Sequence, residues 1–185
     1  MLNNIINNTK ISGLEVIVPE RKISLLDIPN LYDGNQEKID RVINSSGFKN
    51  RRVADSNVTT GDLCFAAAKN LINAMNIDKN SIDGLMFVST TPDYFMPPTS
   101  CVIHNKLGLK DACLLFDMNH ACSGFLYGLY TASSLLNKNV KRILLLVGDT
   151  FNKYSDMFKN NSAPVFGDGG AAILLEYDET AEPMY

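Results

Sequence analysis

The sequence predicts an α/β fold, a single domain whose mixed, mostly parallel sheet is covered by helices on both faces. Two observations predict it. Three short apolar runs lie between residues 84 and 147, and segments with helical spacing of apolar residues separate them. Runs that are apolar on both faces are typical of parallel strands buried between layers of helices, and the right-handed crossover rule places those helices on the two faces. A chain of 185 residues is long enough to bury such a core.

The first part of the chain, up to residue 54, predicts short elements. Loose alternation at residues 11–18 indicates a strand. Two short helices are expected at 24–31 and 36–46, and Gly47 ends the second. Residues 48–54 are expected to form a basic edge strand.

A longer helix is predicted after Thr59. Thr59 and Asp62 have the spacing of a capping box, in which the Asp62 side chain reaches back to the amide of Thr59. Apolar side chains then recur on one helical face, at Cys64, Ala68, Leu71 and Met75. The small residues of this face indicate close packing against the sheet.

The remaining elements alternate between strand and helix. Strands are expected at 84–91, 113–118 and 142–147. Helices are expected at 99–107, where Gly108 ends the helix, and from 122 to about 136. Residues 153–164 are polar and irregular, and 166–176 indicate a glycine turn, beside the helix of Cys122, that enters a final strand. This turn fits the dinucleotide fingerprint, but a strand follows it instead of a helix, so no nicotinamide cofactor is expected.

Composition and charge exclude several function classes. The chain has 17 Lys and Arg against 20 Asp and Glu, and 45% of its residues are hydrophobic. The resulting charge of −3 argues against a nucleic-acid binder, which needs a basic face to neutralise phosphates. No apolar run approaches the ~20 residues of a membrane span, and the N-terminus has no basic region followed by an apolar stretch. We therefore expect a cytoplasmic protein with no nucleic-acid partner and no membrane association.

The cysteines argue against a metal site and against disulfides. Cys64, Cys101, Cys113 and Cys122 lack CxxC spacing, and the chain has only 2 histidines. The paired ligand spacings of a structural zinc site are therefore absent. Disulfides are not expected in a reducing compartment.

Cys122 is the strongest candidate for chemistry. It lies where the strand predicted at 113–118 gives way to a helix, and Ser123 and Gly124 leave room for a sharp turn and for a substrate. The amides of a helix N-terminus favour a thiolate over a thiol. The same amides can hold an oxyanion formed when the thiolate attacks a thioester carbonyl. The alternative is that Cys122 is a small buried hydrophobic residue, as free cysteines usually are.

Four segments of the chain resemble one known family. The stretch Asp117-Met-Asn-His-Ala-Cys122-Ser-Gly-Phe-Leu-Tyr-Gly128 resembles the nucleophile motif of the beta-ketoacyl-acyl-carrier-protein synthase III family, within the thiolase superfamily. Residues 47–51, 89–92 and 166–172 are similar to further segments of that family in the same order, although the last is one residue shorter. The resemblance extends from about residue 11 to residue 176.

The resemblance implies a thiolase-like half-domain of a condensing enzyme. Residues 1–177 would form its N-terminal half, and 178–185 would begin a linker to a second half, where the family places a catalytic His and Asn. Cys122 would take an acyl group from a coenzyme A or acyl-carrier-protein thioester. A malonyl group on acyl-carrier protein would then lose carbon dioxide and attack this acyl group, giving a beta-ketoacyl product of a fatty-acid or related pathway. The family also implies a homodimer, with coenzyme A or phosphopantetheine thioesters as substrates and no other cofactor.

Two alternatives to this function stay open. One is an acyltransferase that passes the acyl group from Cys122 to oxygen or nitrogen without decarboxylation. The other is a non-catalytic thiolase-like subunit that shapes a partner's pocket. His120 is expected to pack and not to act as a base, because two positions before Cys122 it points to the other side of an extended segment. His104, in the middle of a predicted helix, is also expected to be a non-catalytic residue.

Three positions are substrate-binding candidates. Arg41 and Ser45 stand where family members that use coenzyme A carry a Trp and an Arg around the adenine, which favours an acyl-carrier-protein donor but leaves Arg41 able to contact a phosphate. Met96 stands where the family often has an aromatic residue that closes the partner's acyl pocket. A flexible Met there admits a longer or branched acyl chain, or it fills a gap in the loop. Gly169, in the glycine turn, is the third candidate.

A basic cluster precedes the longest predicted helix. Its members are Lys49, Arg51 and Arg52, with Arg41 nearby in the sequence. We interpret Lys49, Arg51 and Arg52 as a docking face for an acidic carrier protein, because charge complementarity sets encounter rate and register. The alternative is a solvated basic face without a partner, which charge clusters usually form.

Overall fold

The computed structural model describes residues 5–28, 31–158 and 166–184. Five strands form the main sheet, in the order β1-β7-β6-β4-β5. They are β1 (Thr9–Ile17), β4 (Gly84–Val88), β5 (Leu114–Met118), β6 (Arg142–Asp149) and β7 (Gly169–Tyr177). β4 runs parallel to both β5 and β6, whereas β7 runs antiparallel to both β6 and β1. Every strand of this sheet except β7 therefore points the same way.

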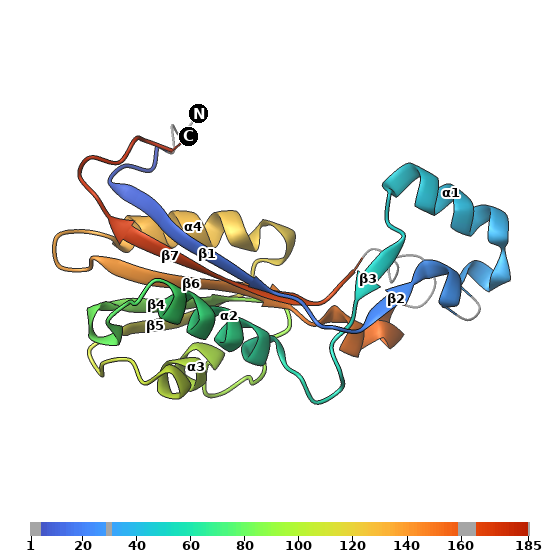
Figure 1. Cartoon of the computed structure of the whole chain (residues 1–185), viewed down its shortest axis with the longest axis horizontal. Coiled ribbons are helices and arrows are strands. Elements are labelled where there is room, and N and C mark those ends of the chain that lie inside the picture. Colours follow the sequence, from blue (N-terminus) through green and yellow to red (C-terminus); the bar gives the residue numbers. More distant parts are fainter. Residues whose placement is uncertain (1–4, 29–30, 159–165, 185) are drawn as a thin grey trace.

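Helices cover both faces of the sheet (Figure 1). α2 (Thr60–Ala74) and α3 (Thr99–Leu107) lie on one face, and α4 (Gly124–Leu135) lies on the other. Successive side chains of a strand point to opposite faces. Phe87 of β4 accordingly packs into the core under α2 and α3, whereas Met86 packs into the core under α4. The predicted α/β class, with its sheet between two layers of helices, is confirmed.

Local capping fixes several helix ends at the predicted residues. At the start of α2, Thr59 Oγ1 accepts a hydrogen bond from the Asp62 amide, and Asp62 Oδ2 accepts one from the Thr59 amide, each 3.1 Å long. The helix α1 (Gln36–Ser46) ends at Gly47, and α3 ends at Gly108. The capping box and both glycine stops are therefore confirmed.

A small lobe, residues 18–54, stands beside the main sheet (Figure 1). It consists of α1 and a two-stranded sheet of β2 (Lys22–Ser24) and β3 (Asn50–Arg52). Leu25 and Ile39 form the centre of its own small core. The lobe thus carries the basic cluster of the sequence outside the main sheet.

The lobe is less regular than predicted. The helix expected at 24–31 is wrong: the Ser24 side chain accepts a hydrogen bond from the Leu26 amide and begins a 3₁₀ turn that ends at Asp27. The edge strand expected at 48–54 is reduced to β3, because only Asn50–Arg52 pairs with β2. The 3₁₀ segments of the chain are Leu25–Asp27, Leu31–Gly34, Lys79–Ser81, Ala121–Ser123 and Phe151–Phe158.

Gly170, the last glycine of the predicted turn, is the second residue of β7 and lies against α2, on the opposite face of the sheet from the Cys122 helix, so the expectation that these glycines lie beside that helix is wrong. A Cβ added at Gly170 would lie 2.7 Å from the Cys64 nitrogen and 2.8 Å from the Leu63 carbonyl carbon, both in the backbone of α2. Only glycine allows this close approach of two backbones. A strand follows the turn, as the sequence predicts. The irregular segment expected at 153–164 contains a 3₁₀ turn up to Phe158, and its remainder lies outside the described residues.

The two ends of the described chain lie together. The amide of Ile6 donates a hydrogen bond to the carbonyl of Met184, and the amide of Met184 donates one to the carbonyl of Ile6, each 3.0 Å long. Figure 1 shows both ends at one corner of the molecule. Over the described ranges, we find no helix with the length and apolar character needed to cross a bilayer.

Candidate functional site

Cys122 is exposed in a tight turn between β5 and α4. The turn is a 3₁₀ segment, Ala121–Ser123, that runs directly into the first residue of α4. Ala121 has a φ of 44°, in the left-handed region that a residue with a side chain rarely adopts. Strained residues of this kind occur where the surrounding fold fixes a functional side chain. The interpretation of Cys122 as a small buried residue is therefore wrong.

Close packing of α4 on β4 holds this turn in place. A Cβ added at Gly124 would lie 2.8 Å from Val88 Cγ1, and one added at Gly128 would lie 2.9 Å from Val88 Cγ2. Val is β-branched and has little rotamer freedom with which to move aside. The glycines therefore let the first turns of α4 rest directly on the end of β4, and the position of Cys122 relative to β4 follows from that contact.

Both histidines have partners other than Cys122. The ring of His120 packs against the ring of Tyr127 on α4, with 3.9 Å between the ring centroids. His104 Nε2 lies 2.9 Å from the carbonyl oxygen of Lys110. These contacts agree with the expectation that both histidines pack within the fold.

A cavity of about 470 Å³ lies at the carboxyl end of the parallel strands. Its walls come from the segment 90–95 that follows β4, and from Asn119, Phe151 and Tyr154. Thr90 also lines a smaller hollow together with His120 and Ala121, at the turn of Cys122. The cavity therefore lies near the turn that carries Cys122, although Cys122 itself does not line it, and its largely aromatic walls suit an apolar group.

Met96 lies just beyond this wall and is 86% exposed. Phe95, its neighbour, lines the cavity and is fully exposed, because the two side chains project from the tip of the segment. Met96 therefore does not close the cavity of its own chain, and its role in an acyl pocket stays a prediction.

The structure gives two of the basic candidates internal partners. Arg52 donates hydrogen bonds through Nη1 to the carbonyl oxygens of Pro19 and Glu20, at 3.2 and 2.8 Å. Arg51 is half-buried; burial lowers its pKa, and the charge of Asp168 acts in the opposite direction. Lys49 is exposed. Of the three proposed docking residues, Lys49 is thus the most accessible.

The other two substrate-binding candidates lie in different parts of the fold. Arg41 is exposed on α1 in the lobe, where its Nη2 lies 3.7 Å from Glu37 Oε1. Gly169 is the first residue of β7 and pairs with Asp149 at the end of β6. Neither residue lines the cavity beside Cys122. The structure therefore does not bring Arg41, Met96 and Gly169 together in one chain.

Acidic residues at loop junctions around the cavity were missed by the sequence interpretation. Asp149 accepts hydrogen bonds from the amides of Thr90 and Thr91. Asp168, which is buried, accepts from the amides of Ala54 and Asn152 and so joins the lobe to the main sheet. A signal was present for Asp149, because it directly follows a buried strand run, and polar residues at the carboxyl ends of parallel strands gather at one edge of a sheet.

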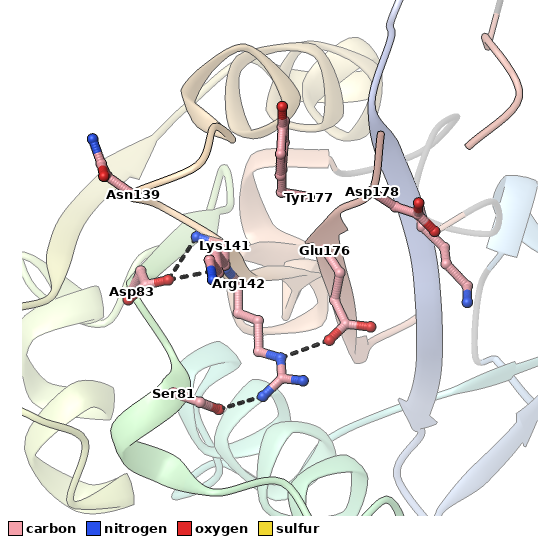
Figure 2. A pocket seen from close by; sticks show the side chains of 9 residues that line it. Ser81, Asp83, Asn139, Lys141, Arg142, Glu176, Tyr177 and Asp178 are labelled. Carbon is pink, nitrogen blue, oxygen red and sulfur yellow. Dashed lines mark hydrogen bonds and ion pairs between the residues drawn. The ribbon is translucent and has the colours of Figure 1, made fainter. Parts of the chain in front are cut away.

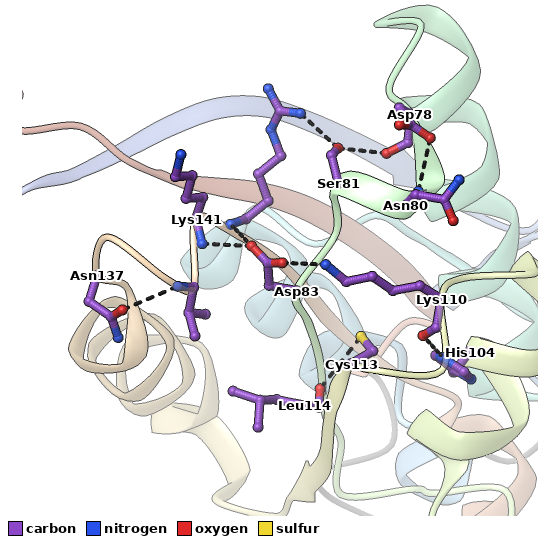
Figure 3. Close-up of polar contacts among 12 residues, drawn as sticks. Asp78, Asn80, Ser81, Asp83, His104, Lys110, Cys113, Leu114, Asn137 and Lys141 are labelled. Carbon is purple, nitrogen blue, oxygen red and sulfur yellow. Dashed lines mark hydrogen bonds and ion pairs between the residues drawn. The ribbon is translucent and has the colours of Figure 1, made fainter.

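A second cavity of about 440 Å³ lies at the opposite end of the sheet (Figure 2). Two of its charged side chains, Arg142 and Glu176, form an ion pair: Arg142 Nε donates to Glu176 Oε1 at 2.6 Å, and Arg142 Nη1 donates to Ser81 Oγ at 2.7 Å. Asp83 beside it accepts hydrogen bonds from the amides of Lys141 and Arg142 (Figure 3). These pairs tie the amino ends of the strands together, so we assign this cavity a structural role. No cluster of potential metal ligands occurs in the part of the chain that the structure describes.

Comparison with known proteins agrees with the resemblance noted in the sequence. Residues 116–184 match the family 3-oxoacyl-[acyl-carrier-protein (ACP)] synthase III. A relative named putative 3-oxoacyl-[acyl-carrier-protein] synthase 3, from Campylobacter jejuni, is 39% identical over 97% of this chain and 51% of its own length. A beta-ketoacyl-[acyl-carrier-protein] synthase III from Halalkalibacterium halodurans is 32% identical over 97% of this chain and 53% of its own length.

Solved structures show the same fold. A 3-oxoacyl-(acyl-carrier protein) synthase from Burkholderia xenovorans superposes with a TM-score of 0.90 at 32% identity, over 97% of this chain and 51% of that one. The H285N variant of OleA from Xanthomonas campestris superposes with a TM-score of 0.81 at 26% identity, over 95% of this chain and 57% of that one. The chain spans about half the length of the curated relatives it matches. The fold and these relatives agree: over nearly its whole length the chain is similar to about half of a 3-oxoacyl-[acyl-carrier-protein] synthase III.

Proposed function

We propose that Cys122 accepts an acyl group from a thioester and that the protein uses it in a condensing reaction. One observation carries this proposal: an exposed thiol stands in a strained turn at the start of α4, and this turn lies near a cavity of about 470 Å³ with largely apolar walls. A nucleophile at this position reaches a thioester carbonyl from solvent, while the cavity receives the acyl chain. Relatives named as synthases of 3-oxoacyl-carrier protein support the same reaction class.

The proposed reaction has two steps. In the first, the Cys122 thiolate attacks the thioester carbonyl, a new carbon–sulfur bond forms, and coenzyme A or the carrier protein leaves as a thiol that takes up a proton. In the second, malonyl-acyl-carrier protein loses carbon dioxide, its α-carbon attacks the acyl group, and the Cys122 sulfur leaves. The product is a beta-ketoacyl thioester on the carrier protein. We propose that the His and Asn implied by the family for decarboxylation come from a second thiolase-like half, so the tests use the complete gene product.

Intact-mass measurement tests the first step. Incubating the complete gene product with acyl-coenzyme A or acyl-acyl-carrier protein should add one acyl mass to the peptide of Cys122. A Cys122→Ala variant should gain no mass, and a Cys101→Ala variant should be acylated like the parent. An unmodified parent would contradict the proposal and favour a non-catalytic subunit.

Carbon dioxide release tests the second step. The acylated parent should release carbon dioxide from malonyl-acyl-carrier protein and form a beta-ketoacyl product. Acylation without this release, together with transfer of the acyl group to an alcohol or amine, would identify a non-decarboxylative acyltransferase.

We also propose that an acyl-carrier protein docks on the lobe, with Lys49 as the most accessible contact. An acidic carrier protein complements this basic residue, and such charge pairs act mainly on encounter rate. Lys49→Glu should weaken carrier-protein binding at low salt, whereas Lys79→Glu, at the opposite end of the sheet, should not. Equal binding by parent and Lys49→Glu would contradict this docking face. Arg51 and Arg52 are poorer test positions, because their substitution also removes internal contacts.

For the whole protein we propose a homodimer in which Met96 reaches the acyl cavity of the partner copy. The exposure of Met96 beside the cavity wall supports this proposal. Met96→Phe should shift the preferred acyl donor toward shorter chains, because a rigid ring occupies space that a flexible Met leaves open. An unchanged chain-length preference would contradict a role in the acyl cavity and would mean that Met96 only fills a gap in its loop.

A further inference from the structure

Asp149 binds the loop that forms the wall of the cavity. It is the last residue of β6, and β6 runs parallel to β4, so its side chain meets the segment that leaves β4. Asp149 Oδ1 accepts hydrogen bonds from the Thr90 amide at 2.8 Å, the Thr91 amide at 3.0 Å, the Thr91 hydroxyl at 3.0 Å and the Ser89 hydroxyl at 3.1 Å. One carboxylate oxygen thus accepts hydrogen bonds from three consecutive residues, 89–91, of which Thr90 and Thr91 line the cavity.

A buried chain of hydroxyl groups extends the hydrogen bonds of Asp149. Thr91 Oγ1 lies 2.9 Å from Thr60 Oγ1 and accepts a hydrogen bond from the Thr150 amide at 2.9 Å. Thr60 Oγ1 in turn lies 2.9 Å from Thr150 Oγ1. All three threonines are buried.

The carboxylate sets the direction of every hydrogen bond in this chain. An ionised carboxylate only accepts, so the single hydroxyl hydrogen of Thr91 is used on Asp149. The Thr60 hydroxyl must then donate to Thr91, and the Thr150 hydroxyl must donate to Thr60. A buried polar network whose members are all paired has one favoured arrangement, and this one links the ends of β4 and β6 with the start of α2.

The same loop has a second anchor two residues further along the chain. Asp93 accepts hydrogen bonds from the Gly61 amide at 2.8 Å and from the Thr59 hydroxyl at 2.7 Å, and its own amide donates to the Thr99 hydroxyl at 3.2 Å. The first part of the wall segment 90–95 is therefore held at two points, and Tyr94 and Phe95 project from the part that follows the second anchor.

We propose that Asp149 is a positioning residue that fixes the cavity wall beside the turn of Cys122 and thereby sets which acyl chain length is accepted. It acts through the segment 89–91 and does not touch the reacting atoms. The inference rests on the proposed acylation of Cys122. A displacement of the wall by a fraction of an ångström changes the length and width available to an acyl chain, and misplacements of about 1 Å can change rates by about a hundredfold.

The chain offers a matched control at the opposite end of the same strands. Asp83 also accepts hydrogen bonds from two consecutive amides, those of Lys141 and Arg142, and from the Lys110 side chain (Figure 3). It joins the amino ends of β4 and β6 as Asp149 joins their carboxyl ends. Removing the carboxylate of either Asp83 or Asp149 is expected to lower stability. A change in acyl selectivity is expected only when Asp149 is substituted.

The test measures acylation of Cys122 in the complete gene product with straight-chain acyl thioesters of increasing length. For Asp149→Ala we expect the thioester concentration at half-maximal acylation rate to rise roughly tenfold for the parent's preferred chain, with loss of the preference between chains. Asp149→Asn retains an oxygen for the two amides and should recover part of the preference. Asp83→Ala should lower the melting temperature and leave the preference unchanged. Alkylation of Cys122 by iodoacetamide, which needs no cavity, should proceed alike in all four proteins.

Each outcome decides the proposal. A chain-length preference that Asp149→Ala retains, or that Asp83→Ala loses to the same degree, overturns it. If Asp149→Ala does not fold, Asp149→Asn decides alone, and a preference identical to that of the parent overturns the proposal. If no thioester acylates the parent, the proposed function fails and the inference loses its basis. If the parent is acylated but the Asp149 variants keep its chain-length preference, the inference alone fails.

Discussion

The four cysteines of the chain occupy environments that range from fully buried to exposed. Cys64 is buried under the sheet, Cys113 is half-buried, and Cys122 is exposed. Burial raises the pKa of Cys64 to about 12 and the pKa of Cys113 to about 11. Only the thiolate reacts with alkylating agents, so both groups are almost unreactive at neutral pH.

Timed alkylation tests this order. With iodoacetamide at neutral pH, we expect the peptide of Cys122 to be modified well before that of Cys113, and Cys64 to react only after unfolding. Peptide mapping by mass spectrometry measures the three rates. A Cys122→Ala variant should lack the fast modification, and a Cys64 or Cys113 that reacts as fast as Cys122 would contradict the assignment of the exposed thiol.

At the scale of single residues, the position of Cys122 in a turn between a strand and a helix could be predicted from the sequence. An apolar strand run ends shortly before Cys122, and small residues follow it. Asp149 also had a positional signal, because it directly follows a buried strand run, but the partners of Asp149 and Asp168 could not be assigned from the sequence. Their roles depend on amides that lie far away in the sequence, as in the contact of Asp168 with Ala54, and only the folded chain brings these groups together. Arg52, a candidate for carrier-protein docking, likewise has carbonyl partners in a separate segment.

Between elements, the contact of β7 with α2 leads to a stability prediction. Gly170→Ala places a Cβ within 2.8 Å of the α2 backbone, which must shift to make room. We expect the free energy of unfolding to fall by about 1–3 kcal/mol. The neighbouring Gly169→Ala meets no atom closer than 3.6 Å and should change it by less than about 0.5 kcal/mol. Chemical denaturation measures both, and equal stabilities would contradict the close packing.

The junction at the amino ends of the strands gives a pH prediction. Burial acts to raise the pKa of Asp83, but hydrogen bonds from Lys110 and from the amides of Lys141 and Arg142 outweigh it and lower the pKa below the ordinary 3.8. A carboxyl whose pKa is lowered by folding stabilises the fold above its ordinary pKa and loses that contribution as pH falls through its folded pKa. Asp83→Asn should therefore lower the melting temperature at neutral pH, and the difference from the parent should shrink below pH 3.8. A difference that stays constant into strong acid would contradict an ionised Asp83.

Element positions could be predicted where local signals bound them. The helix α3 begins and ends at the predicted residues, and Gly108 determines its end. The helix α2 begins at its predicted capping box. The lobe could not be predicted as well, since its strands are only 3 residues long and depend on pairing between distant segments. The sequence also could not predict which face of the sheet these glycines pack against. That face depends on how β7 pairs with β6 in the sheet.

For the molecule as a whole, an apolar surface on the α4 side of the sheet is exposed. Leu14 of β1 pairs with Ile173, whose side chain packs in the core under α4, so Leu14 lies on the same face, where it is 60% exposed. Leu126 on α4 is 65% exposed. Large apolar side chains that are exposed on one side of a molecule indicate a surface that another protein segment can cover.

We expect the 185-residue chain, purified by itself, to self-associate through this surface. Leu14→Lys combined with Leu126→Glu should shift it toward a monomer in size-exclusion chromatography with light scattering. Leu26→Glu is the matched control, because Leu26 is 59% exposed but lies in the lobe. A parent chain that stays monomeric at all concentrations would contradict the prediction.

The bridge between Ile6 and Met184 has a practical consequence for protein engineering. It holds the segment before β1 and the segment after β7 together at the corner of the sheet away from the turn of Cys122 (Figure 1). A fluorophore or affinity handle inserted at this corner is therefore expected to leave the entrance to the cavity free.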